Sequence, residues 1–322
     1  MSTGFHFVQT ELLDIAYEER GPKEGLPVIL LHGWPDDIRT WDGVVAPLNA
    51  AGFRTIAPYL RGFGPTRFRN ESTARSGQLA ALGSDLVELA AALRLGRFAL
   101  VGHDWGARAA YIAATELGPQ HVTHLVTLSV GYGTNDPGQQ LPLVQVRNYW
   151  YHWYFALARG SDLIKNSRRE LGKFLWGTWS PGWRFTDADY AATAASFDNP
   201  DWADLTVHSY RHRWGYAEGD PRYDALERRL SAVPTVRVPT LVLHGDADAC
   251  NHPLTSADKE KFFSNRYERK LLPGIGHFPQ REGSRTVATE LIAWLQNWSA
   301  VQGAPPDRPR DHAIAELRVP PA

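Results

Sequence analysis

The segment Gly102-His103-Asp104-Trp105-Gly106 places a carboxylate between two glycines, after an apolar run and before a helical pattern. A strand, a tight turn and a helix in this order are typical of a nucleophile elbow, G-x-S-x-G, which here has Asp104 in place of serine. Glycines relieve the crowding of such a turn, and a helix N-terminus favours negative charge. We therefore expect an ionised carboxylate that faces a pocket, although an aspartate before a helix can also be a simple N-cap.

Two later segments could complete a catalytic set with Asp104. "LPGIGHFPQRE" places His277 in a loop before the last helix, and "HGDAD" places Asp246 and Asp248 just after a buried strand. An acid there could orient the histidine and fix its tautomer, although aspartates are also common in turns. The chain order nucleophile, acid, histidine is that of the α/β-hydrolase triad, and open α/β sheets place their sites after the ends of strands. The coincidence of three such positions favours catalysis.

A fourth segment, "LLHGWPDD", follows the predicted strand Val28–Leu31. Its turn would direct the backbone N–H of Trp34 toward the elbow, where the N–H of Trp105 also lies. Two N–H donors at one point form an oxyanion hole.

The predicted elements alternate between strands and helices, which is typical of a mostly parallel sheet with helices on both faces. The predicted strands are Asp14–Glu18, Val28–Leu31, Thr55–Pro58, Phe98–Val101, Leu125–Val130, Leu241–His244 and Lys270–Leu272. The predicted helices are Gly77–Leu95, Trp105–Leu117 and Arg285–Trp298. The alternation stops between residues 134 and 234, where Trp, Tyr, Arg and Asp are frequent and no buried strand is evident. We predict an α/β core over 1–133 and 235–302, an inserted helical cap over 134–234 and a peripheral tail over 303–322.

Bulk composition excludes several classes of protein. The chain has 322 residues, a net charge of −1 and one cysteine, Cys250. The charge gives no electrostatic support for nucleic-acid binding, and a single cysteine permits no internal disulfide. No apolar run is long enough for a membrane span, and no early segment resembles a signal peptide. We therefore expect a soluble cytoplasmic protein without a cofactor or metal, and the sequence does not predict an oligomeric state.

Taken together, "HGWP", "APYLRGFGPT", "GHDWGA", "HGDAD" and "GIGHFPQRE" resemble the α/β-hydrolase superfamily, in its epoxide hydrolase and haloalkane dehalogenase branch. These motifs span most of the chain outside the cap and tail. The spacing of the acid in this family selects Asp248 over Asp246. The resemblance also implies two cap tyrosines over the nucleophile, and the family patterns match Tyr151 in "NYWYHWYF" and Tyr210 in "HSYRHRWG", although the first segment offers several tyrosines.

An aspartate nucleophile indicates displacement at an sp3 carbon, because a carboxylate attacks there when the leaving group is good or strained. The product would be an alkyl ester on Asp104. His277 would act second, by activating the water that attacks the ester carbonyl. An epoxide oxygen leaves as an alkoxide and needs strong donors, for which tyrosine hydroxyls with a pKa near 10 are suited.

The motifs therefore predict hydrolysis of a small apolar epoxide, aromatic epoxides included, with water as co-substrate. Trp34, Trp105, His152 and Trp153 are expected to line the substrate pocket. Dehalogenation is the main alternative, because dehalogenases also place a halide-binding indole directly after the nucleophile. Fluoroacetate dehalogenases are similar to this chain at His152-Trp153 and Arg108, but they have an arginine where this chain has Trp105. A ligand-binding module without catalysis would be expected to lack a triad member, and none is missing.

Overall fold

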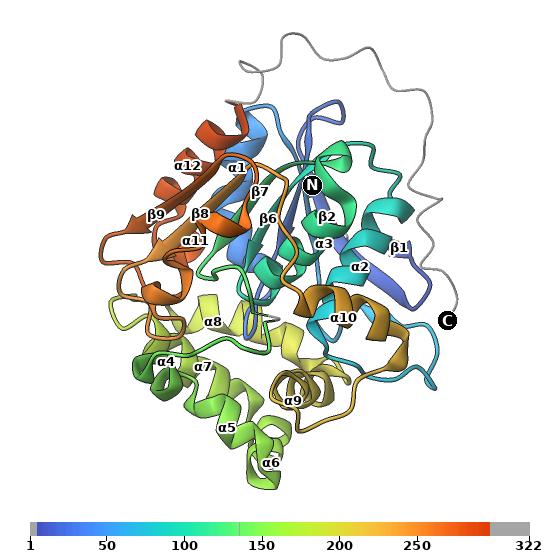
Figure 1. The fold of residues 1–322 in the computed structure, drawn as a ribbon, viewed down its shortest axis with the longest axis vertical. Coiled ribbons are helices and arrows are strands. Elements are labelled where there is room, and N and C mark those ends of the chain that lie inside the picture. Colours follow the sequence, from blue (N-terminus) through green and yellow to red (C-terminus); the bar gives the residue numbers. More distant parts are fainter. Residues whose placement is uncertain (1–4, 135, 297–322) are drawn as a thin grey trace.

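The computed structural model describes residues 5–134 and 136–296, which are built around one nine-stranded sheet (Figure 1). The order of strands is β1-β2-β4-β3-β6-β7-β8-β9, and the short β5 pairs with β2. The strands are β1 (His6–Gln9), β2 (Leu13–Arg20), β3 (Pro27–Leu31), β4 (Arg54–Pro58), β5 (Arg67–Phe68), β6 (Phe98–His103), β7 (Val122–Leu128), β8 (Thr240–Gly245) and β9 (Tyr267–Leu272).

The central strands run parallel from β4 through β3, β6, β7 and β8 to β9, whereas β1, β2 and β5 form an antiparallel edge. Every residue of β6, β7 and β8 is buried. Strands covered on both faces read as continuous apolar runs, which is why these three were recognisable in the sequence.

The right-handed strand–helix–strand crossovers distribute the core helices over the two faces of the sheet. The chain moves one way from β3 through α1 (Asp42–Ala50) to β4, and the opposite way from β6 through α3 (Trp105–His121) to β7. Right-handed crossovers in opposite directions place their helices on opposite faces. The helix α2 (Leu79–Ala92) packs on α3, and α12 (Ser284–Gln296) packs on α1. The short α11 (Pro279–Glu282) links the loop of His277 to α12.

Between β7 and β8 the described residues form helices and no named strand. These helices are α4 (Leu143–Asn148), α5 (Trp150–Ala156), α6 (Ala158–Asn166), α7 (Arg168–Trp179), α8 (Asp187–Ala194), α9 (Trp202–Arg213) and α10 (Asp224–Ser231). Short 3-10 helices occur at Ile38–Trp41, Ala195–Asp198, Pro221–Tyr223, Pro253–Ser256 and Glu260–Phe262. Helices α4 to α9 form a layer at one end of the sheet (Figure 1).

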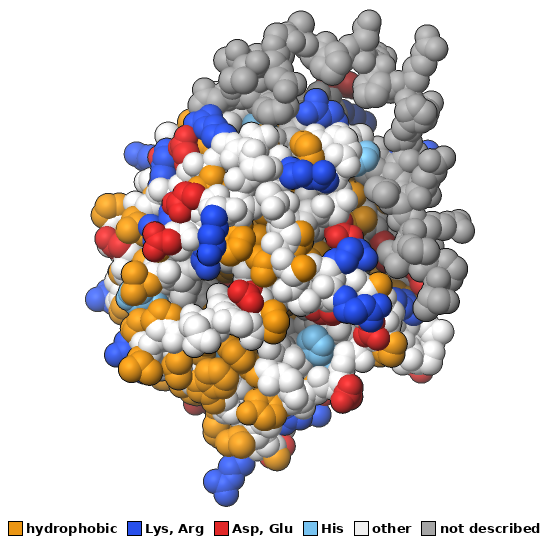
Figure 2. Space-filling model, viewed as in Figure 1, with side chains coloured by type: hydrophobic (Ala, Val, Ile, Leu, Met, Phe, Trp, Pro, Cys, Tyr) orange, Lys and Arg blue, Asp and Glu red, His pale blue; other side chains and the backbone are white. Residues whose placement is uncertain are grey.

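One face of this helical layer carries a concentration of apolar side chains (Figure 2). The large exposed apolar side chains between residues 143 and 174 are Leu143, Val146, Trp150, Leu157 and Phe174. No helix within residues 5–134 or 136–296 has the length and apolar character that crossing a membrane requires.

All the predicted strands and core helices are present over the described residues, most with ends that differ by a few positions; the last two residues of the predicted helix Arg285–Trp298 lie outside the described residues. The predicted strand Leu125–Val130 extends too far, because β7 ends at Leu128 and the next residue, Ser129, has a φ of 62°. Strands β1 and β5 and helix α1 were not predicted: β1 is a largely exposed edge strand, β5 has two residues, and α1 contains Pro47. The predicted tail over 303–322 lies outside the described residues.

Candidate active site

Asp104 stands at a strained turn between β6 and α3. Its φ of 49° and ψ of −112° differ from both the strand before it and the helix after it. A Cβ at Gly102 would lie 2.4 Å from the carbonyl oxygen of Gly106, and one at Gly106 would lie 2.4 Å from the carbonyl oxygen of Leu31. The turn therefore closes only because both positions lack a side chain, and it lifts Asp104 to the carboxyl end of the parallel strands.

His277 lies between two carboxylates. Its Nδ1 is 2.9 Å from Asp248 Oδ2, and its Nε2 is 3.9 Å from Asp104 Oδ2. The other oxygen of Asp248 accepts hydrogen bonds of 2.8 Å from the backbone N–H groups of Cys250 and Asn251. The structure thus brings together the three residues that the motifs selected, and it fixes the carboxylate of Asp248 from both sides.

Asp246, the alternative acid, has a different role. Its Oδ1 accepts a hydrogen bond of 2.7 Å from the backbone N–H of Gly274. Asp246 therefore stabilises the turn between β9 and the loop of His277, and of the two acids it is Asp248 that contacts the imidazole.

The two partners shift each other's pKa in the direction of an ion pair. Burial would raise the pKa of Asp248, but His277 and hydrogen bonds from His244 and His277 outweigh it and hold this pKa below its usual range. Burial would lower the pKa of His277, but the neighbouring Asp248 and Cys250 outweigh it and raise this pKa well above its usual value. The Nε2 of His277 is buried and has no hydrogen-bond partner among the described residues. That nitrogen remains available for a molecule placed beside Asp104.

The loop of His277 is fixed through its backbone. The carbonyl of His277 accepts hydrogen bonds from His103 Nε2 at 2.7 Å and Ser129 Oγ at 3.0 Å. Its N–H donates to Ser180 Oγ at 2.8 Å, and Ser180 in turn donates to Glu282. Burial lowers the pKa of His103 to about 4, so this imidazole is neutral and donates through Nε2. Both backbone groups of His277 are therefore held in place, and Asp248 holds its ring.

The turn after β3 directs a donor at the nucleophile. The backbone N–H of Trp34 donates to Asp104 Oδ1 at 3.1 Å. The N–H of Trp105 begins α3, where the first N–H groups of a helix have no partner within the helix. The indole N–H of Trp34 does not face Asp104; its Nε1 donates a hydrogen bond to Thr206 Oγ1 at 3.0 Å.

An aromatic cage, formed by Trp34, Trp105, Tyr151, Trp179 and Tyr210, encloses the site. All five side chains are buried. The rings of Tyr151 and Tyr210 are 5.3 Å apart, and each lies within 6 Å of Trp34. Tyr151 comes from α5 and Tyr210 from α9, so this cage exists only because the inserted helices fold onto the elbow.

Both tyrosines are protonated donors in this environment. Burial raises the pKa of each hydroxyl well above 10, and the negative charge of Asp104 adds to the effect. The Tyr151 hydroxyl contacts Cys250 Sγ at 3.5 Å, a weak interaction that a better acceptor could replace.

The two remaining predicted pocket residues lie at different depths. His152 is buried, with its ring stacked 4.0 Å from Tyr149 and 4.5 Å from Tyr210. Trp153 is partly exposed, packs 4.8 Å from Trp214 and donates from Nε1 to the carbonyl of Val146. His152 therefore borders the cage, whereas Trp153 belongs to the shell outside it.

Sequence reasoning missed Trp179 and the position of Cys250. Trp179, the last residue of α7, lies 5.1 Å from both the His277 and Tyr151 rings. Its segment, "FLWGTW", has no feature that separates it from other tryptophan-rich stretches. Within the described part of the chain, no group of three or more His, Cys, Asp or Glu residues is arranged to hold a metal ion.

Comparisons with known proteins agree with this fold. The family model of the alpha/beta hydrolase fold matches residues 27–284. The chain is 27% identical to an epoxide hydrolase of Caballeronia sordidicola, over 91% of this chain and 94% of that protein. It is 26% identical to epoxide hydrolase A of Mycobacterium tuberculosis, over 89% and 96% of the two chains.

A solved structure from Klebsiella pneumoniae, designated a candidate epoxide hydrolase, superposes with a TM-score of 0.85 at 38% identity, covering 91% of this chain and 97% of that one. The chain therefore belongs to the alpha/beta hydrolase fold family. This assignment confirms the fold and the family that the motifs predicted.

Proposed function

We propose that this chain hydrolyses an epoxide to a vicinal diol through an alkyl ester formed on Asp104. One observation carries the proposal: the Asp104 carboxylate lies between the Nε2 of His277 and a cage that contains two buried, protonated tyrosines. That set supplies a nucleophile, a base and acids for the leaving oxygen. The epoxide hydrolase names of the relatives support the same reaction.

In the first step, Asp104 Oδ2 attacks a ring carbon. The new carbon–oxygen bond forms as the ring carbon–oxygen bond breaks, and its electron pair passes to the ring oxygen. Tyr151 and Tyr210 donate hydrogen bonds to that oxygen, and one of them transfers its proton. Their raised pKa keeps both hydroxyls protonated until charge develops on the substrate. General acid assistance of this kind is typically worth about 10²–10⁴-fold.

In the second step, His277 Nε2 takes a proton from water, and the oxygen of that water adds to the ester carbon of Asp104. Negative charge develops on Oδ1, which already accepts the Trp34 N–H. One such donor typically contributes ~2.7–4 kcal/mol. Collapse of the intermediate expels the diol oxygen, which takes the proton from His277. The proton left on Asp104 returns to the tyrosinate, so the enzyme regains its starting state.

The pKa of His277 should set the pH dependence of the second step, because only a neutral imidazole accepts a proton from water. Asp248 raises that pKa, so the hydrolysis rate should rise with pH through this raised value. Replacing Asp248 with asparagine leaves the burial and removes the charge. The pKa of His277 then falls, and the rising limb of the plot of ester hydrolysis rate against pH should move to lower pH. The maximal hydrolysis rate, reached above this pKa, should also drop by up to ~10⁴-fold, because the imidazole loses its orientation.

Rapid-quench measurement of ester hydrolysis across pH checks this prediction. Asp246→Asn is the matched control, because that carboxylate accepts a backbone N–H in a turn and does not contact the imidazole. A rising limb at the same pH in Asp248→Asn as in the wild type would show that Asp248 does not tune His277.

Dehalogenation is the second candidate, and the indoles favour it. The Nε1 atoms of Trp105 and Trp179 are buried and have no hydrogen-bond partner among the described residues. Indole N–H groups are weak donors that suit a halide. Such a reaction would use the same ester on Asp104 but would depend on the indoles instead of the tyrosine hydroxyls.

The double variant Tyr151→Phe/Tyr210→Phe separates the two reactions. It keeps both rings and their packing but removes the acids, so diol formation from styrene oxide should fall by about 10²–10⁴-fold. Each single variant should lose less than the double, because two donors share the charge. Halide release from a 1-haloalkane would instead fall most in Trp105→Phe.

The assay measures diol and halide separately for the wild type and these variants. Tyr154→Phe is the control, because it removes a hydroxyl from the same helix without touching the cage. A double tyrosine variant that opens styrene oxide at the wild-type rate would contradict the proposed role of both hydroxyls. Halide release without diol formation would favour the second candidate.

A further inference from the structure

A second histidine, His244 near the end of β8, lies behind the carboxylate that orients His277. The His244 side chain is fully buried, and its Nε2 is 3.3 Å from Asp248 Oδ2. The same carboxylate oxygen is 2.9 Å from His277 Nδ1. Two imidazoles therefore share one oxygen of Asp248. A catalytic triad needs only one of them, so the second requires an explanation.

The neighbours of His244 Nε2 show that this nitrogen carries a proton. It is 2.8 Å from the carbonyl oxygen of Asn251 as well as 3.3 Å from Asp248 Oδ2. A carbonyl and a carboxylate only accept hydrogen bonds, so Nε2 is a donor in either charge state of the ring. One N–H shared between two acceptors in this way is a three-centre hydrogen bond, here with its shorter branch to Asn251.

The other nitrogen of His244 is held from the direction of β9. His244 Nδ1 is 2.8 Å from Ser256 Oγ, which accepts a hydrogen bond of 2.8 Å from Arg269 Nε. Both ring nitrogens thus have partners, which fixes the plane of the imidazole. Rotating the ring away from Asp248 would also break its contact with Ser256.

The carboxylate of Asp248 receives four N–H donors through this arrangement. Oδ1 accepts the backbone N–H groups of Cys250 and Asn251. Oδ2 accepts hydrogen bonds from His277 and His244. Hydrogen bonds to a carboxylate stabilise its charged form. Burial would raise the pKa of Asp248, but His277 and His244 outweigh it and hold this pKa below its usual range.

The donor on His244 opposes the effect of Asp248 on His277. Burial would lower the pKa of His277, but Asp248 and Cys250 outweigh it and raise this pKa well above its usual value. A protonated imidazole takes no proton from water, so a strongly raised pKa impairs the second step. A second N–H at the same carboxylate oxygen weakens the stabilisation of positive charge on His277, and more of that imidazole is then neutral at a given pH.

We infer that His244 is a positioning residue that acts through Asp248: its Nε2–H shares the carboxylate oxygen with His277, so that more of His277 is neutral and able to take a proton from water. The inference rests on the proposed function. It assigns His244 no contact with the substrate, and it predicts an effect on ester hydrolysis instead of ring opening.

Substitution of His244 leaves the other charges near His277 unchanged. Besides Asp248, the titratable groups around His277 belong to the elbow, β6, the turn after β8, α11 and the inserted helices: Asp104, His103, Cys250, Glu282, Tyr151 and Tyr210. His244 itself faces Asp248 and, through Ser256, Arg269. A shift in the pH dependence of hydrolysis would therefore report the Nε2–H of His244.

The turn that follows Asp248 has anchors other than His244. Asn251 Nδ2 donates to the carbonyl of Ser129 at 2.9 Å, and Asn251 Oδ1 accepts a hydrogen bond of 2.9 Å from the Tyr149 hydroxyl. These bonds remain when His244 is replaced. The two backbone donors to Asp248 should therefore stay in place.

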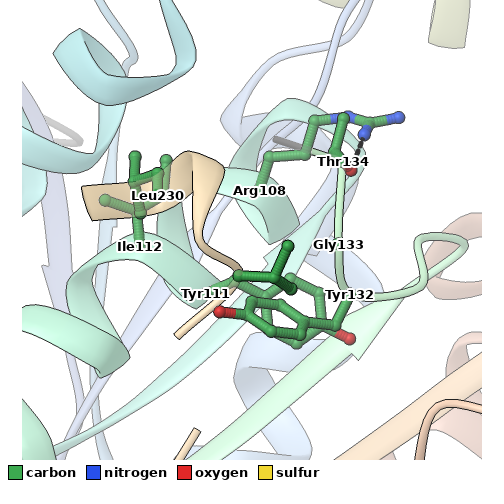
Figure 3. Close-up of a pocket in the computed structure, with 8 residues that line it drawn as sticks. Arg108, Tyr111, Ile112, Tyr132, Gly133, Thr134 and Leu230 are labelled. Carbon is green, nitrogen blue, oxygen red and sulfur yellow. Dashed lines mark hydrogen bonds between the residues drawn. The ribbon is translucent and has the colours of Figure 1, made fainter. Parts of the chain in front are cut away.

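The segment after Ser129 is in turn anchored on α3 (Figure 3). The ring of Tyr111 lies against that of Tyr132, with 5.0 Å between the ring centres. The Tyr111 hydroxyl donates to the carbonyl of Val130 at 3.2 Å. None of these contacts involves His244, so its loss should not displace this segment.

His244→Leu and His244→Gln separate the N–H donor from the bulk of the ring. Leucine fills the space without a donor, so the rising limb of ester hydrolysis rate against pH should move to higher pH by about half a unit or more. This shift is opposite to the one expected for Asp248→Asn. A glutamine amide carries two N–H donors, one for each acceptor, and should return the limb to within about 0.2 unit of the wild type.

Ser256→Ala is the control, because it disturbs the same pocket and leaves His244 Nε2 facing both acceptors. Its rising limb should stay at the wild-type pH in rapid-quench measurements. A His244→Leu protein that hydrolyses the ester more slowly by the same factor at every pH would show that His244 only supports the fold, and would overturn the inference. His244→Met is a second donor-free variant, and it should give the same shift as His244→Leu.

An NMR titration of the His277 ring tests the inference without turnover. The signal is assigned by its absence in His277→Gln. The pKa of His277 should be higher in His244→Leu and His244→Met than in the wild type, and close to the wild-type value in His244→Gln. Equal pKa values in all four proteins would overturn the role of His244 and leave the proposed function standing. A wild type that forms no diol would instead contradict the proposed function.

Discussion

Asp104→Ala is expected to abolish diol formation and to leave the fold intact. The variant removes the atom that attacks the epoxide, and alanine offers no nucleophile in its place. Loss of a covalent nucleophile typically costs on the order of 10⁶-fold in kcat. The fold should survive, because the Asp104 side chain caps no N–H of α3 and its main structural contact is one hydrogen bond from Trp34.

Diol production and thermal unfolding measured on the same sample check this expectation. Alanine at a φ of 49° and the lost bond together predict a decrease of ~1–2 kcal/mol in the free energy of unfolding. A variant that keeps more than a few per cent of wild-type diol formation would contradict Asp104 as the nucleophile. An unfolded variant would show that Asp104 stabilises the elbow more than its contacts indicate.

The elbow was predictable to the residue because its signal is local. The apolar strand, the two glycines and the helix that surround Asp104 are contiguous in the sequence, and each follows from sterics at that point. The choice of Asp248 over Asp246 was different. Both follow the same strand, and only the family resemblance selected Asp248, the acid that the structure places against His277.

The rest of the site depends on contacts between distant segments. Trp179 ends α7, and it meets the ring of His277 only in the folded chain, because the two residues are far apart in the sequence. No spacing in the sequence marks Trp179 among its many aromatic neighbours.

His277→Gln is expected to stop turnover but to leave the first step in place. A carboxylate attacks without a base, so Asp104 should still open the ring and become an ester. Glutamine accepts no proton from water, so that ester should persist, and kcat should fall by ~10⁴-fold or more. Steady-state diol formation should be lost, while rapid-quench analysis should show that the epoxide is consumed in an amount equal to the enzyme.

Intact-protein mass spectrometry of His277→Gln after mixing with styrene oxide tests the formation of an ester on Asp104 most directly. We expect the protein mass to increase by one molecule of epoxide, with the added mass on the peptide that contains Asp104. The double variant Asp104→Ala/His277→Gln should show no such increase. An unmodified His277→Gln protein, or added mass on the peptide that contains the buried Cys250 in place of Asp104, would contradict the proposed mechanism.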